Sequence, residues 1–315
     1  MNDALEPASP ARDYAASAEP EYQVLARTYR PQTFADLIGQ EAMVRTLTNA
    51  FDSGRLAHAF ILTGVRGVGK TTTTINLGAA LAEQGYNVLI VDLDPQGNAS
   101  TGIGVVPQDR DLTTYELLLE DVALSEAIRP TAVEKLAIIP ATVDLSSADI
   151  ELISNEKRSF LLHDALRQTA IDQFGFDFVL IDCPPSLNLL TVNAMVAAHS
   201  VLVPLQSEFF ALEGLSQLML TIREVRQSAN PSLRIEGVVL TMYDARNNLS
   251  QQVEMDARDN LGDLVFQTLI PRNVRVSEAP SYSVPVLEYD TNSKGAMAYR
   301  ALAQELVGKN ARRAA

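Results

Sequence analysis

A glycine-rich stretch over residues 64–71, GVRGVGKT, constrains this chain more than any other feature. The apolar run Ala59–Leu62 before it predicts a short strand, and the residues from Lys70 to Gln84 predict a helix that ends at Gly85. A turn of this kind between a strand and a helix is the setting in which the pattern G-x-x-x-x-G-K-T binds phosphate. A chance glycine-rich turn is the alternative, and both flanking elements argue against it.

The pattern assigns a task to each part of the loop. Successive backbone N–H groups curl around phosphate oxygens, and the start of the helix adds partial positive charge. Lys70 is expected to reach the β- and γ-phosphates, and the Thr71 hydroxyl is expected to hold Mg²⁺. The predicted ligand is a nucleoside triphosphate with its magnesium ion. The residues expected to contact it are Gly67, Val68, Gly69, Lys70, Thr71 and Thr72.

Acidic residues stand where two further apolar runs end. Asp92 and Asp94 follow Val88–Val91, and Asp182 follows Phe178–Ile181. A carboxylate at the tip of a buried strand beside a triphosphate can hold Mg²⁺ through water or orient the attacking water. A carboxylate that only caps a loop is the alternative for each acid taken singly. Three acids together with a phosphate loop favour a magnesium and hydrolysis site.

Apolar strands alternate with helices along the rest of the chain. Strands that are apolar throughout are buried on both faces, and strands separated by helices form βαβ units. The predicted fold is therefore α/β, a mostly parallel twisted sheet with helices on both faces, as in P-loop NTPases. Ligands bind at the carboxyl ends of the strands in such a sheet. The other strands are expected at Leu136–Ile139, Val201–Leu205, Val238–Leu240 and Val265–Ile270.

Composition limits the other possibilities. The 315 residues are 47% hydrophobic, which suffices for a large core. The single cysteine excludes a disulfide framework or a cysteine-rich zinc site within one chain and fits a reducing, cytoplasmic compartment. There is neither a membrane-length apolar run nor a signal-peptide pattern, so no membrane association is expected. Because the net charge is −14, nucleic acid would need a local basic face.

Three regions are predicted along the chain. Residues 1–21 are rich in Ala, Pro and Ser and carry five acidic residues against one arginine, which predicts a disordered acidic tail. Residues 22–58 form an extension with an expected helix from Glu41 to Ser53. Residues 59–313 form the predicted nucleotide-binding domain.

From Gly67 to about Arg313 the chain resembles the ParA/Soj family of chromosome-partitioning ATPases. The stretches that carry the resemblance include GVGKTTTTINLGAALAEQGYNVLIVDLDPQGNASTGIG, FDFVLIDCPPSLNLLTVNAM and IPRNVRVSEAPSYSVPVLEYDTNSKGAMAYRALAQEL. The resemblance implies the deviant Walker A (SIMIBI) branch of the fold, with ATP and Mg²⁺ as cofactors. It implies that Asp94 positions the hydrolytic water with Asp92 beside it, and that Asp182 is the Walker B acid and a magnesium ligand with Thr71 and Asp94. Pro271 and Asn273 would lie near the adenine.

The same resemblance implies a cycle of chromosome or plasmid partitioning in the cytoplasm, on the nucleoid. ATP would drive a homodimer that sandwiches two nucleotides and binds DNA without sequence preference, and a ParB-type partner would stimulate hydrolysis and release. Residues 271–313 carry seven basic and four acidic side chains, a local excess that suits phosphate contacts. An ordinary solvated face is the alternative on charge alone. The candidate DNA contacts are Arg246, Arg275 and Lys294.

A different resemblance covers the N-terminal side of the loop. The stretch from Tyr22 to Thr73, YQVLARTYRPQTFADLIGQEAMVRTLTNAFDSGRLAHAFILTGVRGVGKTTT, is similar to the tau/gamma subunit of the bacterial DNA polymerase III clamp loader. The two resemblances overlap only at GVGKTTT, residues 67–73. This indicates a junction between two ATPase sequences inside a shared phosphate-loop sequence. A clamp-loader fragment is therefore a second hypothesis, although the one cysteine excludes the zinc module of that family.

The junction changes the signature lysine of the loop. ParA proteins have KGGVGKT here, and their first lysine reaches the phosphates of the partner subunit. Val65 occupies that position in this chain, and Arg66 replaces the next glycine. A charge-assisted contact is therefore lost, which predicts impaired dimerisation and hydrolysis. The open alternatives are that Arg66 supplies the missing cation and that the chain binds nucleotide without turning it over.

Overall fold

The computed structural model describes residues 58–64, 67–120, 122–152, 155–167, 174–208 and 211–314. The predicted acidic tail over 1–21 lies outside these residues. So does the predicted extension over 22–58, apart from its last residue, and so do Val65 and Arg66 of the phosphate loop.

A seven-stranded sheet organises the described part, in the order β3-β4-β2-β5-β1-β6-β7. Every neighbouring pair is parallel except β3 and β4, which pair antiparallel. All residues of β2 and β5 are buried, as their continuous apolar sequences predict. The strands are β1 (His58–Leu62), β2 (Val88–Asp92), β3 (Arg129–Pro130), β4 (Leu136–Ile139), β5 (Phe178–Asp182), β6 (Ser200–Gln206) and β7 (Arg234–Thr241).

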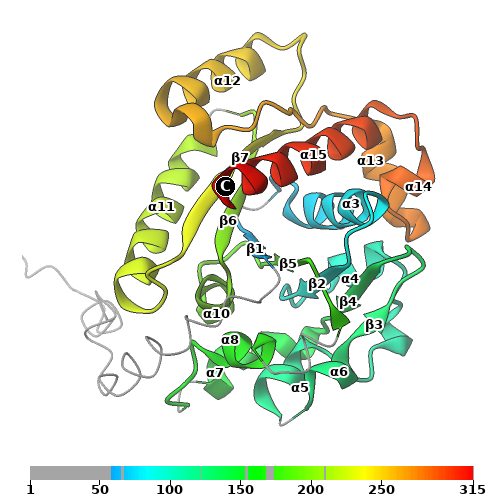
Figure 1. Ribbon diagram of the computed structural model, residues 1–315, viewed down its shortest axis with the longest axis vertical. Helices are drawn as coiled ribbons and strands as arrows, with labels where there is room; N and C mark the ends of the chain where they lie inside the picture. Colours follow the sequence, from blue (N-terminus) through cyan, green and yellow to red (C-terminus); the bar gives the residue numbers. More distant parts are fainter. Residues whose placement is uncertain are drawn as a thin grey trace, which may run out of the picture. The chain divides into compact units, whose positions relative to one another are not determined.

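Helices cover both faces of the sheet, so the predicted α/β fold is confirmed. Figure 1 shows α3, α14 and α15 on one face and α8 and α10 on the other. Within the described residues, none of the helices combines the length and apolar character needed to cross a bilayer. The helices are α3 (Lys70–Glu83), α4 (Asn98–Gly102), α5 (Thr114–Leu119), α6 (Leu124–Ala127), α7 (Ala148–Glu151), α8 (Leu161–Leu166), α10 (Leu189–Ala197), α11 (Ala211–Ser228), α12 (Asn248–Leu261), α13 (Val274–Glu278), α14 (Val286–Tyr289) and α15 (Lys294–Ala314). Short 3-10 turns are η2 (Pro107–Asp109), η3 (Val143–Ser147), η5 (Gly262–Leu264) and η6 (Ala279–Tyr282).

The core holds α3 firmly between the sheet and α15. Leu77 and Leu81 of α3 and Leu302 and Leu306 of α15 are fully buried in one cluster. Each fully buried leucine stabilises the fold by about 1.5–3 kcal/mol. Tyr299 is buried with them, and its hydroxyl lies 3.4 Å from that of Thr73 in the first turn of α3. The helix that begins at the phosphate loop is therefore fixed along its length.

The prediction of a strand over Val265–Ile270 is wrong. This segment touches β7 only through an isolated bridge between Val238 and Val265 and two separate backbone hydrogen bonds. The amides of Gln267 and Thr268 donate to the carboxylate of Glu305 on α15, at 2.8 and 2.9 Å. A side chain from a distant helix thus takes the place of the strand partner that the apolar sequence seemed to require.

Candidate nucleotide-binding site

Three strands bring the predicted site residues to one edge of the sheet. β1 leads into the phosphate loop and lies between β5 and β6. Leu62 at its end pairs with Asp182 at the end of β5, and Asp182 in turn pairs with Asp92 at the end of β2. The carboxyl ends of these parallel strands therefore meet, which is where α/β sheets bind ligands.

The loop has the backbone geometry of an anion cradle. Gly67 and Gly69 adopt left-handed conformations, with φ of 85° and 83°. These conformations are costly for a residue with a side chain, so glycine is favoured at both positions. Gly69 is the N-cap of α3 and has no side chain to offer the first turn. The N–H groups of that turn therefore lack a side-chain acceptor from the cap, and an anion is their natural partner. Thr71 and Thr72 are half-buried in the same turn.

Lys70 is folded back over the loop. Its Nζ donates to the carbonyl oxygen of Gly64 at 2.7 Å, and its side chain is buried. Burial lowers the pKa of Lys70, while the carboxylates of Asp182 and Asp94 act in the opposite direction. The ammonium group thus lies among the acids at the strand tips, in a poorly hydrated setting that favours an anionic partner.

Asp182 has an unusual amount of unused hydrogen-bonding capacity. It is fully buried, and its Oδ1 accepts from the Thr74 hydroxyl at 3.3 Å. Its Oδ2 has no hydrogen-bond partner among the described residues. Burial raises the pKa of Asp182 well above its ordinary value, and the nearby Asp92 raises it further. A buried carboxylate oxygen without a partner is costly unless a ligand satisfies it.

A magnesium ion fits this oxygen. Mg²⁺ prefers oxygen ligands and commonly combines one or two protein carboxylates with water and substrate phosphates. Asp182 offers the carboxylate, and a hydrogen bond from the Thr71 side chain acts to lower the pKa of Asp182. The described part of the chain contains no cluster of three or more His, Cys, Asp or Glu side chains that could hold a metal ion by itself. Water, the Thr71 hydroxyl or phosphate oxygens would complete the coordination of a magnesium ion at Asp182.

Asp92 is saturated with internal hydrogen bonds. Its Oδ2 accepts from the amide and the hydroxyl of Ser100, at 2.9 and 2.7 Å, and its Oδ1 accepts from the amide of Asp94 at 3.2 Å. Burial raises the pKa of Asp92 to about 6, against the lowering effect of these bonds. The carboxylate therefore anchors the loop that carries Asp94 to the start of α4.

Asp94 lies beside Asp92, as the resemblance implied. Its side chain is buried, and its Oδ1 accepts from the amide of Gln96 at 3.0 Å. Its carbonyl accepts from the amide of Gly97 at 2.8 Å, which closes a tight turn. This turn fixes the carboxylate near Lys70 and Asp182, whose pKa values it affects.

Arg110, which no sequence pattern indicated as a site residue, supports the same turn. Its buried guanidinium donates to the carbonyls of Val105 and Ala141 and to the Thr101 hydroxyl, at 2.7–3.1 Å. It also covers Gly97, whose φ is 59° and where a Cβ would lie 2.7 Å from the Ala141 carbonyl oxygen. An arginine in a polar loop carries no local signal of burial, so only its tertiary contacts identify it.

Pro271 and Asn273 lie in the segment that runs beside the end of β7. Pro271 forms a bridge with Tyr243, and the amide of Arg272 donates to the Tyr243 carbonyl at 2.9 Å. β7 in turn contacts the loop, because the Thr241 hydroxyl donates to the carbonyl of Val68 at 2.8 Å. Asn273 caps α13, accepting from the Arg275 amide at 2.8 Å.

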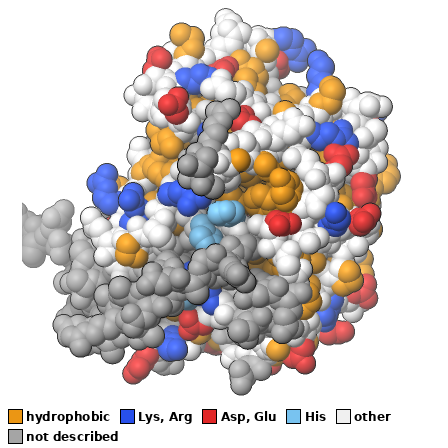
Figure 2. Space-filling view, viewed as in Figure 1, with side chains coloured by type: hydrophobic (Ala, Val, Ile, Leu, Met, Phe, Trp, Pro, Cys, Tyr) orange, Lys and Arg blue, Asp and Glu red, His pale blue; other side chains and the backbone are white. Residues whose placement is uncertain are grey.

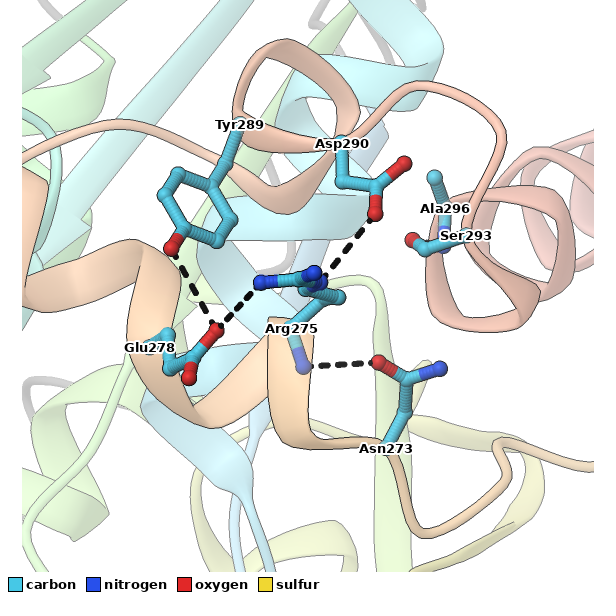
Figure 3. A network of polar contacts seen from close by, with 7 residues as sticks. All are labelled: Asn273, Arg275, Glu278, Tyr289, Asp290, Ser293 and Ala296. Atoms are coloured by element: carbon cyan, nitrogen blue, oxygen red, sulfur yellow. Dashed lines mark hydrogen bonds and ion pairs between the residues drawn. The ribbon is translucent and has the colours of Figure 1, made fainter.

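The three candidate DNA contacts lie on the surface, and two of them are already paired. Figure 3 shows Arg275 between Glu278 and Asp290, at 3.0 and 3.3 Å. Arg246 is exposed and forms a double hydrogen bond with Asp244, and Lys294 is exposed at the first position of α15. On the face in Figure 2, basic and acidic side chains are intermixed rather than separated.

The parallel sheet, the left-handed glycines before α3 and the buried acids at the strand tips define the class of P-loop NTPases. A family model described as an AAA domain matches residues 62–235. The chromosome partitioning protein ParA of Caulobacter vibrioides is 56% identical over 244 residues, which cover 77% of this chain and 91% of that protein. The chain belongs to the ParA/Soj family.

Two further comparisons agree. The sporulation initiation inhibitor protein Soj of Bacillus subtilis is 50% identical over 240 residues, covering 76% of this chain and 94% of that protein. Among solved structures, cobyrinic acid a,c-diamide synthase from Mycobacterium smegmatis, with bound ATP analog and magnesium, matches with a TM-score of 0.71 and 39% identity. That match covers 80% of this chain and 94% of the synthase.

Proposed function

We propose that this chain binds Mg·ATP at the carboxyl edge of its sheet and uses hydrolysis as the switch of a ParA-type partitioning cycle. The observation that carries the proposal is the buried Oδ2 of Asp182, which has no hydrogen-bond partner among the described residues, in a carboxylate whose neighbours include Thr71 and Lys70. A magnesium ion bridging to phosphate satisfies that oxygen, and the loop amides satisfy the phosphates.

Each residue then has a role. The amides from Gly67 to Thr72 surround the phosphates, Lys70 neutralises the β- and γ-phosphates, and Thr71 holds Mg²⁺. Asp182 holds the ion directly or through water, and Asp94 orients the attacking water and contributes to the magnesium shell. Pro271 and Asn273 contact the adenine, since their segment runs beside the strand that supports the loop.

The charges around Asp182 favour the binding of a cation. Without Mg²⁺, burial and the neighbouring acids favour the neutral form of Asp182, because its pKa is raised. A divalent cation and the positive end of α3 favour the ionised form. Nucleotide and metal are therefore expected to bind together, with release of the proton that the raised pKa favours on Asp182.

The proposed cycle also includes contacts with a second copy of the chain, with DNA and with a ParB-type partner. Mg·ATP joins two copies into a sandwich dimer, the dimer binds DNA through Arg246, Arg275 and Lys294, and a ParB-type partner triggers release. Phosphate oxygens must compete with the carboxylates now paired with Arg275 and Arg246, so DNA binding is expected to be sensitive to salt. This cycle operates on the nucleoid in the cytoplasm.

A second candidate function rests on two residues of the phosphate loop, Val65 and Arg66. Val65 replaces the lysine that ParA proteins extend across their dimer, and Arg66 adds bulk beside it. A chain with these residues binds nucleotide within one subunit but dimerises and turns over poorly. We propose in addition that residues 22–58 form a separate extension of clamp-loader origin, preceded by an acidic tail over 1–21.

The test compares the natural chain with Val65→Lys/Arg66→Gly. ATP hydrolysis with and without DNA, and mass by light scattering with Mg²⁺ and a non-hydrolysable ATP analogue, are measured for both. A large gain of hydrolysis and dimer in the double variant supports impairment at the junction. Equal, robust activity in both refutes the impairment. Neither hydrolysis nor a nucleotide-dependent dimer in the double variant refutes the proposed function.

A further inference from the structure

The phosphate loop has carbonyl groups to satisfy as well as amides. In a planar trans peptide the C=O and the following N–H point in opposite directions. An amide that faces a phosphate therefore requires that the carbonyl of the same peptide face into the protein, where it needs a donor. The donor behind a phosphate-facing amide is therefore part of the binding site, and one such donor can be traced for the Gly69 amide.

Three of the described loop carbonyls accept from three different donors. Gly64 accepts from Lys70 Nζ at 2.7 Å, and Gly69 accepts from the amide of Thr73 at 2.8 Å within α3. Val68 accepts from the hydroxyl of Thr241 at 2.8 Å. The first two donors belong to the loop and its helix. The third comes from the end of β7, 173 residues later in the chain.

Thr241 is held so that its hydroxyl has this one direction. Its side chain is buried, and it pairs in register with Gln206 of β6. Its own carbonyl accepts from the amide and the hydroxyl of Ser207, at 3.2 and 3.3 Å. The backbone on which the hydroxyl stands is thus fixed from the neighbouring strand.

Met242, the next residue in the chain, lies near Gly69 of the same peptide. Met242 has a φ of 52°, a left-handed conformation that is costly for a residue with a side chain. This sharp turn brings Met242 Cε to 4.0 Å from the position that a Cβ would occupy at Gly69. A strained backbone conformation of this kind persists only where the contacts of the surrounding structure hold it in place.

We propose that Thr241 is a positioning residue for nucleotide binding: by holding the Val68 carbonyl inward, it keeps the Gly69 amide directed toward the phosphates. The proposal rests on the proposed nucleotide site. Thr241 does not touch the ligand, and it acts only through the Val68–Gly69 peptide. Without the hydroxyl, this carbonyl is a buried acceptor without a donor, and rotation of the peptide turns the amide away.

The test uses two variants at Thr241 and a matched control. Thr241→Val keeps the shape and removes the donor, and Thr241→Ser keeps the donor. Thr131→Val makes the same chemical change at a hydroxyl that donates to the Leu136 carbonyl at 2.7 Å, in the β3–β4 turn. The affinity of each for Mg²⁺ with a non-hydrolysable ATP analogue is measured by calorimetry, and stability is measured by urea unfolding.

Thr241→Val is expected to bind about tenfold more weakly or worse, whereas Thr241→Ser and Thr131→Val bind within about twofold of the natural chain. The proposal is overturned if Thr241→Val binds the nucleotide within twofold of the natural chain. It is also overturned if Thr241→Val and Thr241→Ser lose affinity equally. If Thr241→Val does not fold, Thr241→Cys makes the same test with a weaker donor, and unchanged affinity there overturns it too. Absence of binding by the natural chain refutes the proposed function instead.

Discussion

The tips of β2 and β5 carry the same residue type side by side, and their surroundings prepare them for different tasks. Asp92 and Asp182 are paired in register and are both buried. Asp92 accepts three internal hydrogen bonds, from Ser100 and Asp94. Asp182 accepts one from Thr74 and keeps a buried oxygen unpartnered among the described residues. The first carboxylate is part of the scaffold, and the second is available to a ligand.

Removal of the charge at β5 is expected to give the largest effect on activity. Asp182→Asn keeps the shape of the side chain but loses the anionic oxygen that Mg²⁺ requires, so ATP hydrolysis should fall by about 10²–10³-fold. Steady-state hydrolysis measures this, in the Val65→Lys/Arg66→Gly background if turnover of the natural chain is too slow. Activity within a few fold of the parent would show that Asp182 does not serve the reaction.

When unfolding free energy is measured, truncation to alanine is expected to matter more at Asp92 than at Asp182, the reverse of the order expected for activity. Asp92→Ala leaves buried donors of Ser100 and Asp94 without an acceptor and should cost about 3 kcal/mol of unfolding free energy. Asp182→Ala should cost about 1 kcal/mol or less, because the Thr74 hydroxyl still donates to the Lys70 carbonyl at 3.1 Å. Urea unfolding measures both losses of unfolding free energy. Equal losses at the two positions would contradict the assignment of Asp92 to the scaffold and Asp182 to the ligand.

The turn after β2, which carries Asp94, belongs to the same supporting structure as Asp92. A substitution at Gly97 should destabilise it. Gly97→Ala adds a Cβ in a left-handed conformation, close to the Ala141 carbonyl and the Arg110 guanidinium. The change is expected to cost about 1–3 kcal/mol of unfolding free energy and to lower hydrolysis through Asp94. Gly175→Ala is the control, since its φ is also 59° but nothing lies within 4 Å of the added Cβ. A Gly97 variant no worse than the Gly175 variant would contradict the supporting role.

A pH series separates the charge on Asp182 from its shape. Because its pKa is raised in the folded chain, the folded state binds more protons than the unfolded state above about pH 4, and its contribution to stability falls as pH rises. Without Mg²⁺, the stability of Asp182→Asn relative to the natural chain should therefore increase as the pH rises above about 4. His199, whose pKa is lowered to about 4, acts in the opposite direction and cancels in the difference. A difference that does not vary with pH would contradict the raised pKa.

The smallest expected effect concerns the surface rather than the strand tips. Arg275→Gln removes one candidate phosphate contact and should reduce the salt dependence of DNA binding by about one unit of slope, with little change in ATP affinity. Fluorescence anisotropy with duplex DNA at several salt concentrations measures the slope. Arg258→Gln, which removes an arginine paired with Glu254 on α12, is the matched control. Equal slopes in both variants would remove Arg275 from the DNA-binding face.

The same contrast explains how far the sequence could predict the molecule. The strand tips were predictable, because Asp92 and Asp182 directly follow continuous apolar runs and the phosphate loop stands between a strand and a helix. Those signals are local. β3 was missed because its two residues are too short to show a period.

Long-range polar contacts could not be predicted. Arg110 and Thr241 act on residues of other elements, and neither stands in a local pattern. Val265–Ile270 was predicted as a strand because it is apolar, yet Glu305 from α15 takes up two of its amides. Which of two neighbouring aspartates is saturated also depends on Ser100, eight residues beyond Asp92, and not on the strand sequences.

The central claim is that the loop amides and the Asp182 carboxylate converge on one magnesium-bound triphosphate. The most direct test is calorimetric titration of ATP into the natural chain and into Asp182→Asn, each with Mg²⁺ and with EDTA. The account predicts binding that Mg²⁺ strengthens in the natural chain and a variant in which Mg²⁺ makes no difference. No heat on titration of Mg·ATP, or the same magnesium dependence in both proteins, would contradict it.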